Sequence, residues 1–142
     1  MRYFVADPRG VSFADLCEAI QTVDPKYDLP AEGNVSELRF DGDIYGQLEI
    51  NVPGDGLFDA EVQEHVENAQ YNGAGQIDRV VNILRSAKAT LCVQVLNQGR
   101  ESDFTLERIA PLWAWLFLNR PGILHAGGEG YYDEDDLIVE TD

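Results

Sequence analysis

Apolar residues recur at helical spacing in four stretches of the chain. In the first of them, Ser12 precedes Phe13, Leu16, Cys17 and Ile20, which stand at positions i, i+3, i+4 and i+7. A hydroxyl residue directly before such a pattern is a preferred N-cap, so a helix is predicted from Ser12 to about residue 23. The same period predicts two helices within residues 57–87 and a fourth helix over residues 103–119.

Shorter apolar runs bounded by turn residues predict strands. They cover residues 3–6, 35–40, 44–52, 89–96, 122–126 and 131–139. The second and third runs are joined by Asp41-Gly42-Asp43, and an Asp-Gly pair in that place is a strong hairpin signal. Apolar and polar residues alternate through the third run, so one face of that strand is expected in the core and the other in water.

The order of these elements predicts an α+β fold. It runs β-α-β-β, then two helices, then β-α-β-β. We therefore predict a single domain over residues 1–142, with a mainly antiparallel sheet of about six strands and helices on one face. Residues 1–52 and 89–142 form two pseudo-halves around the central helices of residues 57–87, which indicates a β-α-β-β pseudo-duplication.

The fourth predicted helix is more apolar than one sheet face requires. Every residue from 109 to 118 is apolar, whereas a helix on a sheet needs an apolar stripe only about 100° wide. Trp113 and Trp115 project about 200° apart, so they do not both face one sheet. Two interpretations fit: the helix is sandwiched between the sheet and the central helices, or one Trp face contacts a second chain. The second interpretation predicts a protein interface, including a homodimer.

The net charge of the chain limits the classes of partner that it is expected to bind. The 142 residues include 10 Lys and Arg against 26 Asp and Glu, a formal net charge of −16. Such a chain lacks the cationic surface that phosphate backbones require, and anionic membranes repel it, so neither nucleic acid nor membrane is predicted as a partner. Residues 1–52 carry −6, residues 53–100 carry −2 and residues 101–142 carry −8. The negative charge therefore concentrates in the two pseudo-halves.

Targeting and redox features predict a cytoplasmic protein. The N-terminal apolar run is too short for a secretory signal, and no stretch approaches the roughly 20 apolar residues of a membrane span. Cys17 and Cys92 are far apart and lie in apolar patterns. We expect them to be packed, reduced thiols.

Patterns for metal binding and catalysis are incomplete. The hairpin at residues 41–46 begins like a calcium loop, yet Val52 stands where a bidentate Glu is needed, which favours a plain turn. The only two imidazoles are His65 and His125, and no spacing supplies further zinc ligands or a nucleophile beside a base. No catalytic residue, metal ligand or cofactor is predicted.

Three classes of function remain. The charge favours a non-enzymatic interaction protein that binds a basic protein partner, as an inhibitor or immunity-like protein covers the cationic site of a nuclease or toxin. One alternative is a small-ligand-binding or sensory module. The other is a metal-assisted hydrolase that uses clustered carboxylates, of which the run at residues 133–136 is the densest. For the first class, the hypothesised partner-binding residues are aromatic and acidic side chains of the hairpins and the fourth helix: Tyr45, Glu129, Tyr131, Tyr132, Asp133, Glu134, Asp135, Asp136, Trp113 and Trp115.

Overall fold

Ten strands and four helices make up the part of the chain that the computed structural model describes, residues 1–54 and 56–141. Asp55 and Asp142 lie outside the described residues. The elements are β1 (Arg2–Val5), α1 (Phe13–Val23), β2 (Tyr27–Asp28), β3 (Ala31–Glu32), β4 (Val35–Phe40), β5 (Asp43–Asn51), α2 (Phe58–Asn72), β6 (Ala74–Gly75), α3 (Ile77–Arg85), β7 (Ala89–Val95), α4 (Ser102–Asn119), β8 (Gly122–Ala126), β9 (Gly130–Asp133) and β10 (Asp136–Glu140).

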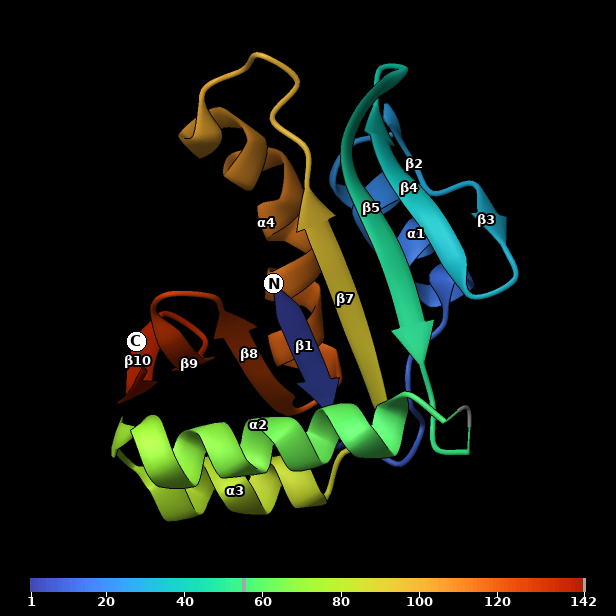
Figure 1. Ribbon diagram of the computed structural model, residues 1–142. Helices are drawn as coiled ribbons and strands as arrows, with labels where there is room; N and C mark the ends of the chain where they lie inside the picture. The colour runs from blue at the N-terminus through green and yellow to red at the C-terminus, as the bar shows by residue number, and fades with distance from the viewer. Residues whose placement is uncertain (55, 142) are drawn as a thin grey trace.

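The strands form one antiparallel sheet (Figure 1). Its order is β2-β4-β5-β7-β1-β8-β9-β10-β6, and β3 also pairs with β4, so β1 lies at the centre between β7 and β8. The predicted antiparallel α+β domain is confirmed, although the described chain has ten strands instead of about six. The strands β2, β3 and β6 have two residues each, which is too short to leave a periodic pattern. A turn at residues 134–135 also divides the predicted run 131–139 into β9 and β10.

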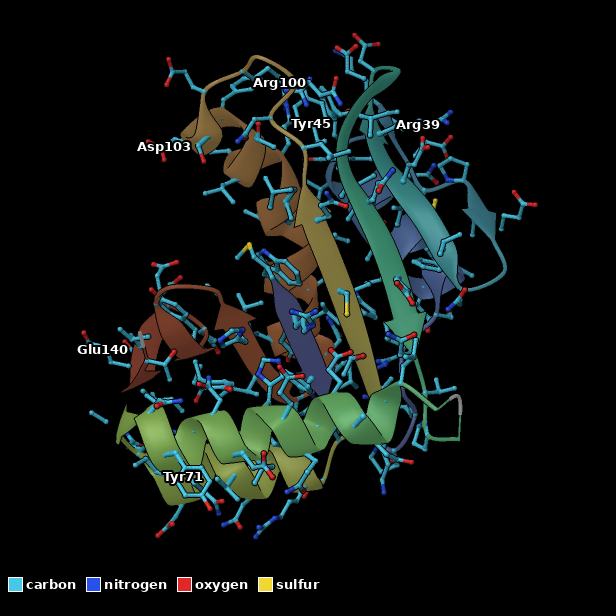
Figure 2. The ribbon with its side chains drawn as sticks, viewed as in Figure 1. Arg39, Tyr45, Tyr71, Arg100, Asp103 and Glu140 are labelled. Carbon is cyan, nitrogen blue, oxygen red and sulfur yellow. The ribbon has the colours of Figure 1, made fainter. Side chains whose placement is uncertain are left out.

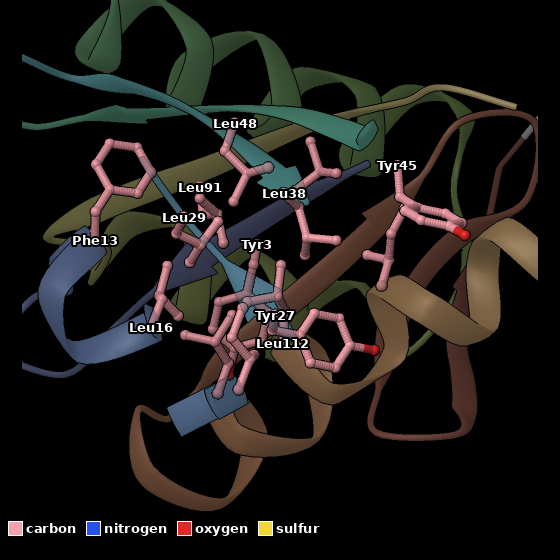
Figure 3. Packing of buried hydrophobic residues seen from close by; sticks show 14 of the residues in the cluster. Tyr3, Phe13, Leu16, Tyr27, Leu29, Leu38, Tyr45, Leu48, Leu91 and Leu112 are labelled. Atoms are coloured by element: carbon pink, nitrogen blue, oxygen red, sulfur yellow. The ribbon is translucent and has the colours of Figure 1, made fainter. Parts of the chain in front are cut away.

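Helices cover both faces of this sheet, so the prediction of helices on one face is wrong. Along β1, Tyr3 and Val5 pack in a core with residues of α1 and α4, whereas Phe4 packs in a second core with residues of α2 and α3. Figure 3 shows the first core, with Tyr3 and Leu112 of α4 close together. The cause is that the central strands are apolar on both sides, and each apolar face must be covered.

The two pseudo-halves repeat an order of elements but not a position in the sheet. The hairpin of residues 1–52 places its second strand, β5, beside β7, whereas that of residues 89–142 places its first strand, β8, beside β1. Residues 24–34 join α1 to β4 and let the chain reach the sheet edge before the hairpin begins. Only Arg120 and Pro121 join α4 to β8, so β8 must start where α4 ends. The pseudo-duplication is therefore not a structural repeat.

The fourth predicted helix, α4, packs on the sheet but is not covered by the central helices. It shares its core with α1 on one face of the sheet, while α2 and α3 lie on the other face (Figure 1). The interpretation in which the central helices sandwich α4 is therefore wrong. Because nothing of the described chain covers its outer side, Leu118 near the C-terminal end is 84% exposed.

Candidate protein-binding groove

A groove of about 700 Å³ runs between the C-terminal half of α4 and the hairpins of β8, β9 and β10. One wall is an apolar stripe of α4, and the floor and opposite wall come from the sheet and its turns. Its lining residues are Met1, Ala110, Trp113, Ala114, Phe117, Leu118, Leu124, Ala126, Glu129, Tyr132, Glu134 and Asp135. We call this feature the acidic groove.

The helical wall of the acidic groove follows from residue spacing. Ala110, Trp113, Ala114, Phe117 and Leu118 stand at i, i+3, i+4, i+7 and i+8, so they form one continuous stripe. The stripe lies beside the residues that α4 buries against the sheet. The apolar surface of α4 is therefore wider than the part that is buried in the fold. The two alanines make the middle of the stripe shallow, so another backbone can approach the helix there.

The helical wall of the groove is held against the sheet by aromatic contacts. Trp113 stacks on Tyr3 at 6.5 Å between ring centroids, and Phe117 meets the same ring edge-on at 5.0 Å. The Tyr3 hydroxyl donates to the carbonyl of Arg120 at 2.7 Å, which fixes the end of α4 to β1. Burial raises the pKa of Tyr3, and the nearby carboxylates Asp133 and Glu134 raise it further. The Tyr3 hydroxyl therefore stays neutral and keeps its hydrogen bond to Arg120.

The opposite wall is formed by acidic turns. Glu134 and Asp135 are the two residues between the paired ends of β9 and β10, and Glu134 has a left-handed backbone with φ of 53°. Glu129 lies in the turn between β8 and β9, where its Oε1 accepts a hydrogen bond from Tyr132 Oη at 2.9 Å. This hydrogen bond to a carboxylate raises the pKa of Tyr132, and burial and the Glu129 charge act in the same direction.

The rim of the groove carries uncompensated negative charge. Within the residues that the structure describes, Glu129, Glu134 and Asp135 form no ion pair. No Lys, Arg or His side chain lines the groove, and the one cation among the lining residues is the Met1 ammonium, which donates to the Val93 carbonyl at 3.0 Å. An apolar floor beside free carboxylates is a surface that suits a ligand with one apolar side and one cationic side.

The structure brings together half of the residues predicted for partner binding. Trp113, Glu129, Tyr132, Glu134 and Asp135 all line the acidic groove. The sequence hypothesis missed the rest of the helical wall: Ala110, Ala114, Phe117 and Leu118. Their helical spacing was the available signal, because a stripe beside the buried one is visible once the buried positions are known.

The other predicted residues lie elsewhere. Asp133 points to the opposite face of the sheet and forms an ion pair with Arg79 of α3, and Asp136 is exposed at the base of the turn. Trp115 lies under the guanidinium of Arg120, 5.0 Å from its ring centroid, and does not line the groove. Tyr131 is fully buried in the second core.

Tyr45 is also buried, and it has a structural partner. The guanidinium of Arg100 lies 3.9 Å from the centroid of its ring, and Figure 2 shows the two side chains together at one end of the sheet. The same guanidinium donates to the carbonyls of Ile44 and Leu96. Tyr45 and Tyr131 therefore have no exposed ring to offer a partner, and we leave both out of the proposed surface.

The two histidines meet on the face of the sheet opposite the groove. The rings of His65 and His125 are 4.7 Å apart, and His65 Nδ1 lies 2.8 Å from Tyr131 Oη. Tyr131 Oη also lies 3.2 Å from the His65 carbonyl, and the tautomer of the imidazole determines whether Nδ1 or Oη is the donor in the shorter contact. The hydrogen-bond partner of this imidazole is thus a tyrosine and not the carboxylate that a hydrolytic base would need.

No set of side chains in the described chain is placed to bind a metal ion. Among residues 1–54 and 56–141, no three His, Cys, Asp or Glu side chains lie close enough to hold a metal ion. Residues 41 and 42 of the calcium-like pattern form the β4–β5 turn, with φ of 51° and 85°. The Cys92 thiol donates a hydrogen bond to Glu61 Oε1 at 3.5 Å. Burial and the Glu61 charge raise the pKa of this thiol to about 11, so it is a poor nucleophile.

Comparisons of the chain with protein-family models, with curated proteins and with solved structures found no match. None of the helices among the described residues is long and apolar enough to cross a membrane.

Proposed function

We propose that this chain is a non-enzymatic interaction protein that binds a basic protein partner through the acidic groove. The observation that carries the proposal is the combination of the exposed apolar stripe of α4 with three described carboxylates that form no ion pair, those of Glu129, Glu134 and Asp135. Apolar contact would supply affinity, and the carboxylates would select a cationic partner and speed its encounter. An inhibitor or immunity-like protein that covers a cationic site is the concrete form of this function.

Charge complementarity supports a basic partner over other occupants. The chain carries −16 in total and −8 within residues 101–142, which hold α4 and the turns of the groove. A second copy of the chain would bring like charges together, and like charges across an interface are unfavourable. The metal-assisted hydrolase has no ligand set in the described chain. A small-ligand module is supported less, because the polar side chains that line the groove are the Tyr132 hydroxyl and three carboxylates of like charge.

The proposal can be tested by selecting ligands without prior bias. A displayed library of random peptides of about sixteen residues is selected against the wild-type protein. The enriched peptides are then measured against Glu129→Gln, Glu134→Gln and Asp135→Asn combined in one variant. Each exposed carboxylate contact is worth roughly 0.2–1 kcal/mol, so the three together should weaken binding by about tenfold at low salt.

Enrichment of peptides with net positive charge, and weaker binding by the triple variant, would support the function. Peptides without net positive charge, or equal binding by both proteins, would overturn it. Asp136→Asn serves as the matched control, because Asp136 is exposed on β10 but does not line the groove. This control should bind the peptides as the wild type does.

A further inference from the structure

The helical layer on the α4 side of the sheet ends before the sheet does. On this face α1 and α4 cover β1, β4, β5 and β7. On the opposite face α2 and α3 cover β8, β9 and β10, where Ile123, Tyr131 and Val139 are buried. On the α4 side the layer thins out across these strands: Leu124 of β8 is still buried in the first core and Tyr132 of β9 is only partly buried against it. The α4-side residues of the three strands are Leu124, Tyr132 and Leu137, which stand opposite one another in the register, and Leu137 is 43% exposed.

The uncovered strip has the width of one helix. Neighbouring strands are about 4.8 Å apart, so β8, β9 and β10 span about 10 Å. An α-helix with its side chains is about 10 Å in diameter, and helices pack about 8–10 Å apart. A helix laid beside α4 would therefore cover these strands and complete the layer. Ala110 and Ala114 face this strip and leave room for close helix packing.

The length and polarity of the strip define that helix further. From residue 110 to residue 118 the helical wall rises about 12 Å, which matches two to three turns. One side of the strip is the apolar stripe of α4, and the other side carries Glu129, Glu134 and Asp135. A ligand helix would need apolar side chains toward α4 and the sheet, and cations on the flank that meets the acidic turns.

We infer that the partner inserts a short amphipathic α-helix with a basic flank, which becomes the third helix of the α4-side layer. This inference rests on the proposed function and names the form of the partner segment. It predicts that helical spacing of the ligand's apolar residues, and not its composition alone, determines its affinity.

The test uses Trp113 as a reporter inside the groove. The chain has two tryptophans, and Trp115→Phe leaves only Trp113. Three synthetic peptides of about twelve residues are titrated at about 20 mM salt. The first has Leu at helical spacing and Lys on one flank, the second has the same residues with Leu at every other position, and the third is the first with a central proline, which breaks a helix.

We expect the helical peptide to shift the Trp113 emission and to bind at least tenfold more tightly than the other two. In the same background, Ala114→Met should weaken this peptide by about tenfold because it fills the middle of the strip. Ala14→Met, on the exposed side of α1, is the matched control and should change nothing.

The possible outcomes distinguish failure of the helix inference from failure of the proposed function of the groove. Tighter binding of the alternating peptide, still sensitive to Ala114→Met, would overturn the helix and leave the groove function standing. Binding of the helical peptide that ignores Ala114→Met would overturn the placement of the helix. If none of the peptides shifts the Trp113 emission, the proposed function of the groove fails as well.

Discussion

The paired histidines make the stability of this fold depend on pH. His65 on α2 packs against Phe4, Tyr131 and the ring of His125. Burial, together with the charges of His125 and Arg2, lowers the pKa of His65 to about 3. Burial also lowers the pKa of His125 to about 4, assisted by Arg2 and the N-terminal ammonium. Glu61, Glu64 and Glu67 of α2 are acidic groups on this side, and Glu61 is already paired with Arg2.

The sign of the effect follows from these lowered pKa values. An unfolded histidine takes up a proton below a pH of about 6.5, whereas these two stay neutral in the folded protein until about pH 4 and pH 3. Their contribution to stability is therefore full above about pH 6.5 and is lost as the pH falls toward 4. Each histidine adds up to about 1.4 kcal/mol per pH unit within that window. For His125 this amounts to about 2 kcal/mol between pH 7 and 4.5, which we halve to about 1 kcal/mol because the ring is partly exposed.

The assay is urea unfolding of the wild type and His125→Gln at pH 7 and at pH 4.5. The wild type should lose about 1 kcal/mol more free energy of unfolding between the two pH values than the variant does. Asn68→Ala is the control, because it removes a hydrogen bond to Tyr131 without removing a titratable group, and it should keep the wild-type pH dependence. Equal losses in His125→Gln and the wild type would refute the reasoning.

Three further predictions concern single side chains. Glu134→Asn should raise the free energy of unfolding in urea by about 0.5–1 kcal/mol, since asparagine tolerates the left-handed backbone at this turn better than glutamate; a decrease would contradict this. Cys92 should react with iodoacetamide at pH 8 much more slowly in the folded protein than in urea, because only about one thiol in a thousand is ionised in the folded protein. Mass spectrometry of the labelled peptide measures both rates, and equal rates would mean that the thiol is not protected. Leu116→Ala should cost about 3–4 kcal/mol in the same urea assay, because Leu116 is fully buried between α4 and the sheet; a cost under 1 kcal/mol would show that the site collapses around the smaller side chain.

Local structure was predictable where neighbouring residues determine it. Ser12 caps α1 as predicted, with its Oγ accepting from the amide of Asp15 at 3.1 Å. The Asp-Gly signal at residues 41–42 gives the expected hairpin, and the run around residues 89–96 gives β7. In each case the information lies within a few residues, so tertiary contacts had little left to decide.

The faces of the sheet were not predictable in the same way. Tyr3, Phe4 and Val5 are all fully buried, and an apolar run without alternation indicates a strand covered on both faces, but it does not say which helices cover which face. Whether α2 and α3 join α1 and α4 or cover the other side is decided by contacts between distant residues. The length of the connections, eleven residues after α1 and two after α4, was visible, but its effect depends on where the sheet edge lies.

For the candidate site, the sequence indicates which segments are acidic or apolar, but not the direction in which each side chain points. The acidic turns and the apolar fourth helix were evident as segments, yet adjacent residues of a strand point to opposite faces. Tyr131 therefore enters the second core while Tyr132 reaches the groove, and Asp133 pairs with Arg79 while Glu134 stays free at the rim. Only the register of β8, β9 and β10 determines which member of each pair is available, and a bulge at Ile138 shifts that register within β10.

The net charge and the apolar stripe are best understood together. An exposed apolar surface on its own invites self-association. In this chain a symmetric contact through the groove would place Glu129, Glu134 and Asp135 of one copy near the same carboxylates of the other, within two molecules that each carry −16. Repulsion between them disfavours that contact at low salt, whereas a cationic partner gains both the apolar contact and the attraction. The acidity therefore selects among possible occupants of the stripe, which connects the charge pattern of the sequence to the partner that we propose.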